Sequence, residues 1–310
     1  MTTLTCYACQ SPLHPDDMHC STCGSLQVLH VKYRLLRVLG NGGFGIVYEA
    51  AEEFPRRHCA IKQIRTTSAE HQHQIQEEAN ILARYAPEFR FMPIIYNVWS
   101  EGQDTVYLSM EYIRGQTLQD HVSQHGPWPP ARVTQFLQTM LEYLARMHDV
   151  GIIHRDIKPA NIMRTTRGRY VLIDFGIAKK GDTTVMKTFS PYYAPPEQHG
   201  SITDRRSDLY SLGATAYYLL TGRPPEDSSD RVYWNLPLTS PADLVSDIPS
   251  ACVTMITTLL ELDPRARPHD ARAALRMLMP PTITDVCLHQ HLAGHPRGNT
   301  PPFPGVYHAA

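Results

Sequence analysis

The 310-residue chain has almost no excess charge and no long apolar run. It carries 29 Lys and Arg against 30 Asp and Glu, a net charge of −1 at pH 7, which gives no bulk attraction to nucleic acid or to an anionic membrane. No stretch approaches the roughly 18 apolar residues of a membrane-spanning helix. The first residues, MTTLTCYACQ, lack the charged and apolar regions of a signal peptide. These absences predict a cytoplasmic protein with no membrane span and no nucleic-acid partner.

Cysteine is scarce everywhere except at the N-terminus. Four of the seven cysteines form two CxxC pairs there, Cys6/Cys9 and Cys20/Cys23. Each CxxC turn brings two thiolates together, and two such turns complete the tetrahedral sulfur shell that Zn²⁺ prefers. The sequence therefore predicts a short zinc ribbon over residues 1–28, whose folding depends on the metal.

Other readings of the ribbon are a CxxC redox pair or two small disulfides, and His14 or His19 as substitute ligands. A redox pair would need a strand–helix junction, and four cysteines already fill the site. The acidic pair Asp16-Asp17 and the scarcity of Lys and Arg disfavour DNA binding. We expect a structural module or a contact site for a protein partner.

After residue 30 the pattern changes twice. Alternating or β-rich runs predict strands over 31–40, 59–65 and 105–113, with a helix over 69–85 between the last two. Helical apolar stripes then predict helices over 131–148 and 208–220. Residues 281–310 are rich in Pro, Gly and His and lack periodicity, which is typical of a tail.

The first motif with chemical content is GNGGFGIV, residues 40–47. It follows the strand predicted at 31–40 and leads into further extended residues, VYEAA at 47–51, whereas a dinucleotide-binding glycine motif would open a helix. Glycines in such a turn let backbone N–H groups approach phosphates. A plain flexible hairpin would have a similar sequence.

The second motif is Ala60-Ile61-Lys62. A lysine inside an apolar strand needs a partner, because burying an unpaired ammonium is costly. On the following helix Glu78 lies on the inward stripe and Glu77 points away, so we predict that Glu78 pairs with Lys62. The alternative is a surface lysine whose stem lies along the sheet.

The third and fourth motifs are HRDIKPAN at 154–161 and LIDFG at 172–176. Asn161 and Asp174 offer the oxygen ligands that Mg²⁺ prefers. Asp156 could accept a proton from an incoming hydroxyl, and Lys158 could neutralise a phosphate in transfer. The alternative for HRDIKPAN is a polar surface turn held by Pro159.

The ordered set GNGGFGIV, AIK, Glu78, HRDIKPAN, DFG, PPE, DLYSLG and LDPRARP resembles the eukaryotic-type (Hanks-type) protein kinases over about residues 31–280. With the CxxC module, the chain is similar to bacterial serine/threonine kinases that carry an N-terminal zinc ribbon. The resemblance implies an α+β, two-lobed protein kinase fold at 29–280. Its β-rich N-lobe would span about 31–113 and its α-helical C-lobe about 116–280.

The resemblance also implies a site for ATP and Mg²⁺. The residues over the phosphates would be Gly40, Asn41, Gly42, Gly43, Phe44 and Gly45, with Lys62 on the α- and β-phosphates and oriented by Glu78. Adenine would contact Val47, Ala60, Met110, Glu111, Ile113 and Met163. The catalytic loop would supply Asp156 as base, Lys158 on the γ-phosphate, and Asn161, which with Asp174 would hold Mg²⁺.

Further roles follow from the resemblance. Lys158 is typical of kinases that act on Ser or Thr, and Arg155 of kinases activated by phosphorylation of the activation segment, here at Thr183, Thr184 or Thr188. Ser190 would be structural. The remaining expectations are an ion pair between Glu197 and Arg267, hydrogen bonds from the catalytic loop to Asp208, and a packed His154 beneath Phe175.

The sequence departs from the family pattern at Phe189-Ser190 and at Pro195-Pro196-Glu197. Both lie near the expected peptide site and bear on substrate preference. Two competing functions remain. One is a pseudokinase scaffold that recruits partners through the ribbon. The sequence disfavours it, because pseudokinases usually lose one of six catalytic residues that are all present here: Lys62, Glu78, Asp156, Lys158, Asn161 and Asp174. The other is a small-molecule kinase, which the full activation segment disfavours.

Overall fold

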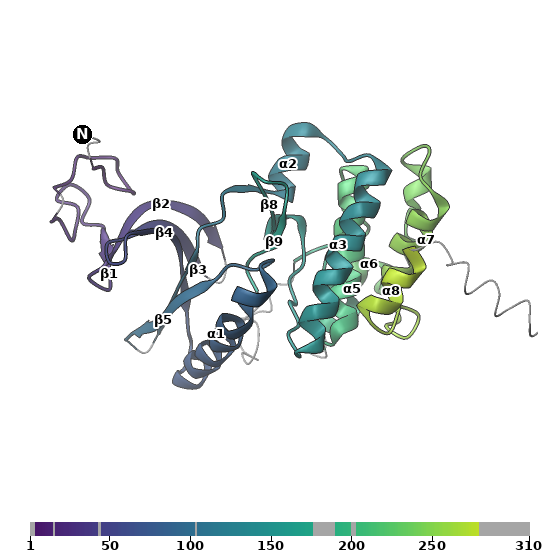
Figure 1. Ribbon diagram of the computed structural model, residues 1–310. Coiled ribbons are helices and arrows are strands. Elements are labelled where there is room, and N and C mark those ends of the chain that lie inside the picture. Colours follow the sequence, from purple (N-terminus) through teal and green to yellow (C-terminus); the bar gives the residue numbers. More distant parts are fainter. Residues whose placement is uncertain are drawn as a thin grey trace, which may run out of the picture.

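The structure, a computed structural model, describes residues 4–14, 16–42, 45–102, 104–175, 190–199 and 203–278. It has two lobes, a strand-rich one and a helical one (Figure 1). The cysteine-rich N-terminus lies at the far end of the strand-rich lobe. The two-lobed α+β architecture predicted from the sequence is confirmed.

The N-terminal lobe is built on an antiparallel six-stranded sheet in the order β1-β2-β3-β4-β6-β5. The strands are β1 (Val28–Leu29), β2 (Tyr33–Gly42), β3 (Gly45–Glu52), β4 (Arg57–Arg65), β5 (Ile95–Glu101) and β6 (Thr105–Glu111). Because side chains alternate along each strand, the sheet has two distinct faces. Each face packs against a different partner.

Helix α1 (Ala69–Phe89) covers one face. It begins at the N-cap Ser68, whose hydroxyl accepts a hydrogen bond from the His71 amide at 3.1 Å. Ile75, Ala79 and Leu82 are buried on one side of the helix. The three residues lie at i, i+4 and i+7, so the inward stripe predicted for this helix is confirmed.

The opposite face of the sheet carries an aromatic cluster and contacts the cysteine-rich segment. The rings of Tyr33 and Tyr107 both stack on Trp99, with centroids 5.1 and 5.2 Å away. Tyr7 of the N-terminal segment packs edge-on against Tyr48 at 5.6 Å. The N-terminal segment is therefore continuous with the sheet core, because β1 also pairs directly with β2.

The C-terminal lobe is helical, with one small sheet ordered β7-β8-β9 next to the connection between the lobes. Its strands are β7 (Gly115–Thr117), β8 (Ile162–Thr165) and β9 (Tyr170–Leu172), and η1 (Pro159–Asn161) and η3 (Pro241–Asp243) are short 3-10 turns. Its helices are α2 (Leu118–His125), α3 (Pro130–Asp149), α4 (Pro196–His199), α5 (Arg205–Thr221), α6 (Ser228–Tyr233), α7 (Ser250–Leu259) and α8 (Ala271–Leu278).

Helix α5 forms the centre of this lobe and is buried on nearly all sides. Close packing against α7 depends on Gly213, where a Cβ atom would lie 2.7 Å from the Leu259 Cβ. Helix α3 packs beside α5, and Figure 1 shows the two nearly side by side. None of the described helices combines the length and the apolarity required to cross a membrane.

Candidate active site

The glycine-rich segment forms the tip of the β2–β3 hairpin, where Gly42 pairs with Gly45. Gly45 has φ 133°, and a Cβ atom there would lie 1.8 Å from the Gln63 carbonyl oxygen. Only glycine fits this close approach between strands. Gly40 and Asn41 lie just before Gly42 at the end of β2, while the predicted Gly43 and Phe44 lie outside the described residues.

Strand register places the predicted nucleotide residues on one face of the sheet, opposite the aromatic cluster. Val47 pairs with Lys62, and Ala60 pairs with Met110. Ile113 follows β6 and is buried. These side chains therefore line the side of the sheet that faces the helical lobe.

Two further predicted residues complete this region. The Glu111 amide donates a hydrogen bond of 2.8 Å to the Ile94 carbonyl, which fixes the end of β6. Met163 comes from β8 in the other lobe, where it pairs with Val171. An apolar pocket also opens beside Lys62 and Asp174, and its other lining residues are Leu82, Met92, Pro93, Ile95, Leu108, Met110 and Phe175.

Lys62 finds a different partner from the one predicted. Its ammonium contacts the carboxylate of Asp174, whereas a carboxylate oxygen of Glu78 lies 3.7 Å from the Arg155 guanidinium. Glu78 does face inward and Glu77 is exposed, as predicted. The helical pattern identified the correct face of α1, but it could not show that Asp174 approaches Lys62 from the other lobe.

The Lys62–Asp174 contact sets the charge state of the site. Burial raises the pKa of the Asp174 carboxyl, but the nearby Lys62 ammonium outweighs this and holds the pKa below its ordinary value. Asp174 is therefore ionised at neutral pH. An ionised carboxylate is the form that binds a metal ion.

The catalytic-loop residues form one hydrogen-bonded unit. The Asn161 side-chain amide donates to the Asp156 carbonyl at 2.9 Å and to its carboxylate at 2.8 Å. The Lys158 ammonium lies 3.1 Å from the same carboxylate. The Ile173 amide donates to the Asn161 carbonyl at 2.9 Å, so Asp174 follows directly after a residue bonded to the loop.

A serine hydroxyl connects the two charged groups of this loop. The Ser190 hydroxyl donates to Asp156 Oδ1 at 2.8 Å and accepts from the Lys158 ammonium at 2.7 Å. The sequence predicted a structural role for Ser190 without identifying these partners. No local pattern signals them, because 34 residues separate Ser190 from Asp156.

The backbone of the loop is anchored to α5, as predicted. The Asp208 carboxylate is fully buried and accepts hydrogen bonds from the amides of His154 at 2.9 Å and Arg155 at 2.8 Å. It also accepts from His148 Nε2 at 3.0 Å, a partner that the sequence did not reveal. Burial raises the pKa of Asp208, but these bonds outweigh it and the pKa lies below its ordinary value.

His154 is a packing residue, as predicted. Its side chain is fully buried, and its ring lies against Phe175 with centroids 4.4 Å apart. Nε2 is 3.2 Å from the Ile173 carbonyl oxygen, to which it can donate. Burial lowers the pKa of His154, so the ring is neutral near pH 7.

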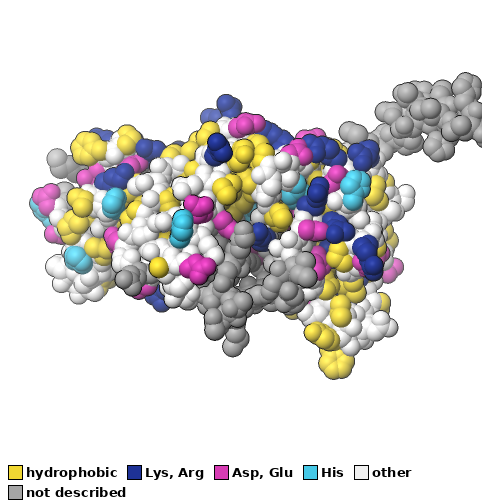
Figure 2. Space-filling view, turned by 90° about the horizontal axis from the view of Figure 1, so that it is seen from below, with side chains coloured by type: hydrophobic (Ala, Val, Ile, Leu, Met, Phe, Trp, Pro, Cys, Tyr) yellow, Lys and Arg dark blue, Asp and Glu magenta, His cyan; other side chains and the backbone are white. Residues whose placement is uncertain are grey.

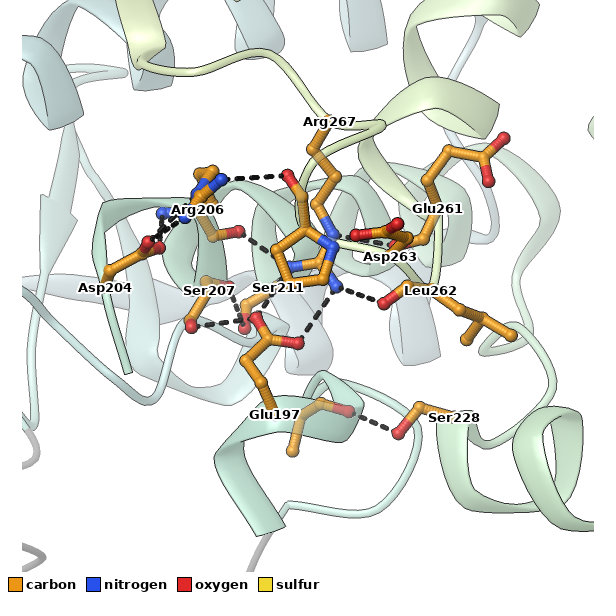
Figure 3. A network of polar contacts seen from close by, with 12 residues as sticks. Glu197, Asp204, Arg206, Ser207, Ser211, Ser228, Glu261, Leu262, Asp263 and Arg267 are labelled. Carbon is orange, nitrogen blue, oxygen red and sulfur yellow. Dashed lines mark hydrogen bonds and ion pairs between the residues drawn. The ribbon is translucent and has the colours of Figure 1, made fainter. Parts of the chain in front are cut away.

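The predicted ion pair between Glu197 and Arg267 is confirmed, and Figure 3 shows its surroundings. The two guanidinium nitrogens lie 2.7 and 3.0 Å from the two carboxylate oxygens, a bidentate contact. Arg267 also donates to the main-chain carbonyls of Arg206, Glu261 and Leu262. The pair ties α4 to α5 and to the loop before α8.

The four N-terminal cysteines converge as predicted. Their sulfur atoms all lie within 4.8 Å of one another, with 3.7 Å between Cys6 and Cys23 and 3.6 Å between Cys9 and Cys20. Zinc–sulfur bonds of about 2.3 Å in a tetrahedron place sulfurs about 3.8 Å apart. The spacing therefore fits a tetrahedral zinc ion.

Hydrogen bonds favour the thiolate form in this cluster. The Gln27 side-chain amide and the Ala8 amide each donate to the Cys6 sulfur at 3.4 Å. Burial raises the pKa of Cys6, but hydrogen bonds from Ser25 and the main chain lower it to about 5. Gly24, directly after the second CxxC pair, has the left-handed conformation that glycine adopts readily, with φ 74°.

A family model described as "Protein kinase domain" matches residues 33–278. Serine/threonine-protein kinase F of Synechocystis sp. is 34% identical over 244 residues, covering 70% of this chain and 49% of that protein. Serine/threonine-protein kinase pkn2 of Myxococcus xanthus is 35% identical over 271 residues, covering 79% and 32%. The chain thus spans half or less of the length of these two relatives.

Two solved structures share the fold. "PpkA-294 apo form" has a TM-score of 0.67 and 23% identity, covering 82% of this chain and 98% of that one. The Mycobacterium tuberculosis PknI kinase domain has a TM-score of 0.64 and 24% identity, covering 81% and 97%.

Proposed function

The chain belongs to the protein kinase family, as its motifs predicted, and we propose that it is an active, Mg²⁺- and ATP-dependent serine/threonine kinase. It would transfer the ATP γ-phosphate to a Ser or Thr hydroxyl of a protein substrate. The observation that carries this proposal is the hydroxyl of Ser190, held between the Asp156 carboxylate and the Lys158 ammonium. An acceptor hydroxyl needs the same two neighbours.

The chemistry follows from these two charges. Asp156 orients the substrate hydroxyl and takes its proton as the new oxygen–phosphorus bond forms. Lys158 offsets negative charge on the phosphoryl group in transfer. The bond between the γ-phosphorus and the bridging oxygen breaks, and ADP leaves with that oxygen. The hydrogen bonds from the His154 and Arg155 amides to Asp208 hold the loop in position throughout.

The residues present also fit Mg²⁺. Asn161 and Asp174 supply carboxamide and carboxylate oxygens on segments joined by a backbone hydrogen bond. When bound, the metal neutralises phosphate charge. Lys62 would exchange its contact with Asp174 for the phosphates, and the glycine-rich segment 40–45 would cover them. The adenine ring would lie against the sheet face that carries Val47 and Ala60.

We include activation by phosphorylation in the proposal. The acceptors would be Thr183, Thr184 or Thr188, which lie outside the described residues. Arg155 supports this role, since its guanidinium is partly exposed and lies near Glu78. A phosphate on the activation segment would attract the same guanidinium.

The test of the function is transfer of radiolabelled γ-phosphate to a generic basic protein and to the chain itself. Asp156→Asn and Lys62→Met should each reduce incorporation by about 100-fold or more. Asp243→Asn, at an exposed position of the helical lobe, serves as the control and should leave phosphate incorporation unchanged. Equal incorporation by wild type and Asp156→Asn would contradict the proposal. ATP binding without any transfer would favour the pseudokinase scaffold.

For residues 1–28 we propose a structural zinc ribbon that caps the aromatic face of the kinase domain at 29–280. The sulfur spacing and the packing of Tyr7 on Tyr48 support it. Elemental analysis should find about one Zn²⁺ per chain and a loss of that metal in Cys20→Ser. Protein free of zinc, with all four thiols reactive, would reject the site. A protein partner that binds the ribbon remains compatible with this role.

A further inference from the structure

A cluster of hydrogen-bond donors lies where α2, α3 and the small sheet meet in the helical lobe. Figure 1 shows α2 beside β8 at this edge of the lobe. The cluster contains His121 of α2, Arg132 of α3, Arg164 of β8 and Tyr170 of β9, and we call it the Arg132 cluster. Because side chains alternate along a strand, Arg164 points away from the face on which Met163 would contact adenine. The cluster is therefore separate from the nucleotide site.

His121 lies between two groups that can only donate hydrogen bonds. It is 8% exposed. The Trp128 indole Nε1 donates to His121 Nδ1 at 3.4 Å, and Arg132 Nη2 lies 3.3 Å from His121 Nε2. A neutral imidazole has one N–H and one acceptor nitrogen, so it can accept from only one of these donors. Since Trp128 occupies Nδ1, the Nε2–H and the Arg132 guanidinium face each other as two donors that need a common acceptor.

The protein does not neutralise the positive charge at this point. Burial lowers the pKa of His121, and the charges of Arg132, His125 and Arg164 lower it further, so the ring is neutral near pH 7. The same two arginines oppose the burial that raises the pKa of the Tyr170 hydroxyl. Both are partly buried. Among the described residues neither forms an ion pair with a carboxylate, although other arginines of the helical lobe do.

The donors are held in fixed positions. The Arg132 guanidinium stacks over the Trp128 ring, with its carbon 3.7 Å from the ring centroid. Trp128 is 3% exposed, and its main-chain amide donates to the Leu219 carbonyl at 2.6 Å, which ties it to the end of α5. Arg164 lies on a strand that is paired on both sides. Donors that are already ordered lose little entropy when they bind a ligand.

Three further arginines surround the cluster. Arg114 precedes β7, and Arg167 and Arg169 lie in the turn between β8 and β9; all three are exposed. The Thr166 amide donates to the Arg114 carbonyl at 3.2 Å, which brings the two segments together. On the face of the molecule in Figure 2, by contrast, Lys and Arg side chains have Asp and Glu side chains interspersed among them. A local excess of positive charge attracts anions.

The geometry points to a binding site for a phosphate dianion at the Arg132 cluster. The ligand is free phosphate or the phosphate group of a phosphorylated Ser or Thr side chain on a protein. Its oxygens accept from His121 Nε2–H and from the guanidiniums of Arg132 and Arg164. A charge of about −1.5 to −2 matches two guanidiniums better than the single charge of a carboxylate does. The site binds without taking part in phosphoryl transfer, so it does not rest on the proposed kinase activity.

Isothermal titration calorimetry of the full chain tests the site with four probes. These are inorganic phosphate, an otherwise uncharged peptide with one phosphoserine, and the same peptide with Ser or with Glu in that place. The phosphopeptide should bind about 10-fold or more tightly than the Glu peptide, and the Ser peptide should not bind. The affinity for phosphate should fall as the salt concentration rises.

Two variants of the cluster identify the donors. Arg164→Gln removes one charge from a side chain without an ion pair in the described chain, and it should weaken phosphopeptide binding about 10-fold or more. Arg132→Lys keeps the charge but loses the planar fork, and it should also weaken binding. Arg272→Gln is the matched control, because Arg272 lies on α8 and pairs with Asp149. Lys158→Ala removes a cation of the transfer site, and both controls should bind as wild type does.

Nuclear magnetic resonance locates the ligand directly. The chain has three tryptophans, and only the indole N–H of Trp128 is bonded to His121. Its ¹H–¹⁵N signal should shift when phosphate or the phosphopeptide is added, whereas the signal of Trp99 in the other lobe should not. This readout also serves any variant whose folding is in question, since wild type alone supplies it.

The outcomes are distinct. Phosphopeptide bound more tightly than inorganic phosphate supports the site and assigns it to a modified protein, and equal affinity supports it and assigns it to free phosphate. No binding of either probe by wild type overturns the inference. So does binding that Lys158→Ala abolishes, because the phosphate then occupies the transfer site. Equal affinity for the phosphoserine and Glu peptides, or an unmoved Trp128 signal, also overturns it.

Discussion

Replacing Arg267 with methionine should destabilise the helical lobe more than any surface change. The Arg267 side chain is 0% exposed, and its loss leaves the Glu197 carboxylate and three main-chain carbonyls without their charged donor. Removing one partner of a buried ion pair costs about 3–5 kcal/mol. Proteins are stable by only about 5–15 kcal/mol in total, so the change removes a large fraction of the stability.

Urea unfolding followed by circular dichroism measures this loss. With a slope of about 2–3 kcal/mol per molar, the midpoint should fall by about 1–2.5 M. Arg265→Met is the matched control: Arg265 is 87% exposed and pairs with Asp263 at the surface, so its midpoint should not change.

A double variant tests the reason for the effect. Glu197→Leu in the Arg267→Met background removes the orphaned carboxylate and should recover part of the lost midpoint. The reasoning is refuted if Arg267→Met unfolds at the wild-type midpoint, or if Arg265→Met loses as much. A double variant less stable than Arg267→Met alone would show that packing, rather than the unpaired charge, dominates.

The folded pKa of Asp208 lies below its ordinary value of 3.8, so its stabilising contribution is present above that value and is lost as pH falls through the folded pKa. The difference in urea midpoint between wild type and Asp208→Asn should therefore be full at pH 7 and shrink below about pH 4. A difference that stays constant with pH would contradict this. Gly213→Ala places a methyl group 2.7 Å from the Leu259 Cβ and should cost about 1–3 kcal/mol in thermal unfolding, whereas an unchanged Tm would mean that α5 and α7 separate freely. Tyr7→Ala should lower Tm yet retain full zinc content, because Tyr7 packs on Tyr48; loss of the metal would show that sheet contact helps to form the ribbon.

The sequence predicted long elements better than short ones. The helix expected at 131–148 spans Pro130–Asp149, and the one expected at 208–220 spans Arg205–Thr221. Their length gave each a clear pattern of apolar residues. β5 (Ile95–Glu101) was not predicted, because most of its side chains are only partly buried and do not alternate. Helix α1 continues past the predicted end at 85 and includes Pro87.

The motifs identified the family and the residues that gather at the site, but not every contact between them. The Glu197–Arg267 pair and the Asp208 anchor were predicted because the resemblance carries them. The Lys62–Asp174 contact and the position of Ser190 depend on how the two lobes and the 190–199 segment come together in space. Local periodicity specifies which face a side chain occupies, and no more than that.

The burial of Asp208 in α5 has a consequence for how the catalytic loop moves. The amides of His154 and Arg155 are bonded to a side chain on the most enclosed helix of the lobe. Opening this part of the loop therefore requires disturbing α5, and its local opening free energy should approach that of global unfolding. Hydrogen exchange at these two amides should be as slow as in the centre of α5. The loop that meets the substrate is thus among the last parts of the chain to fluctuate.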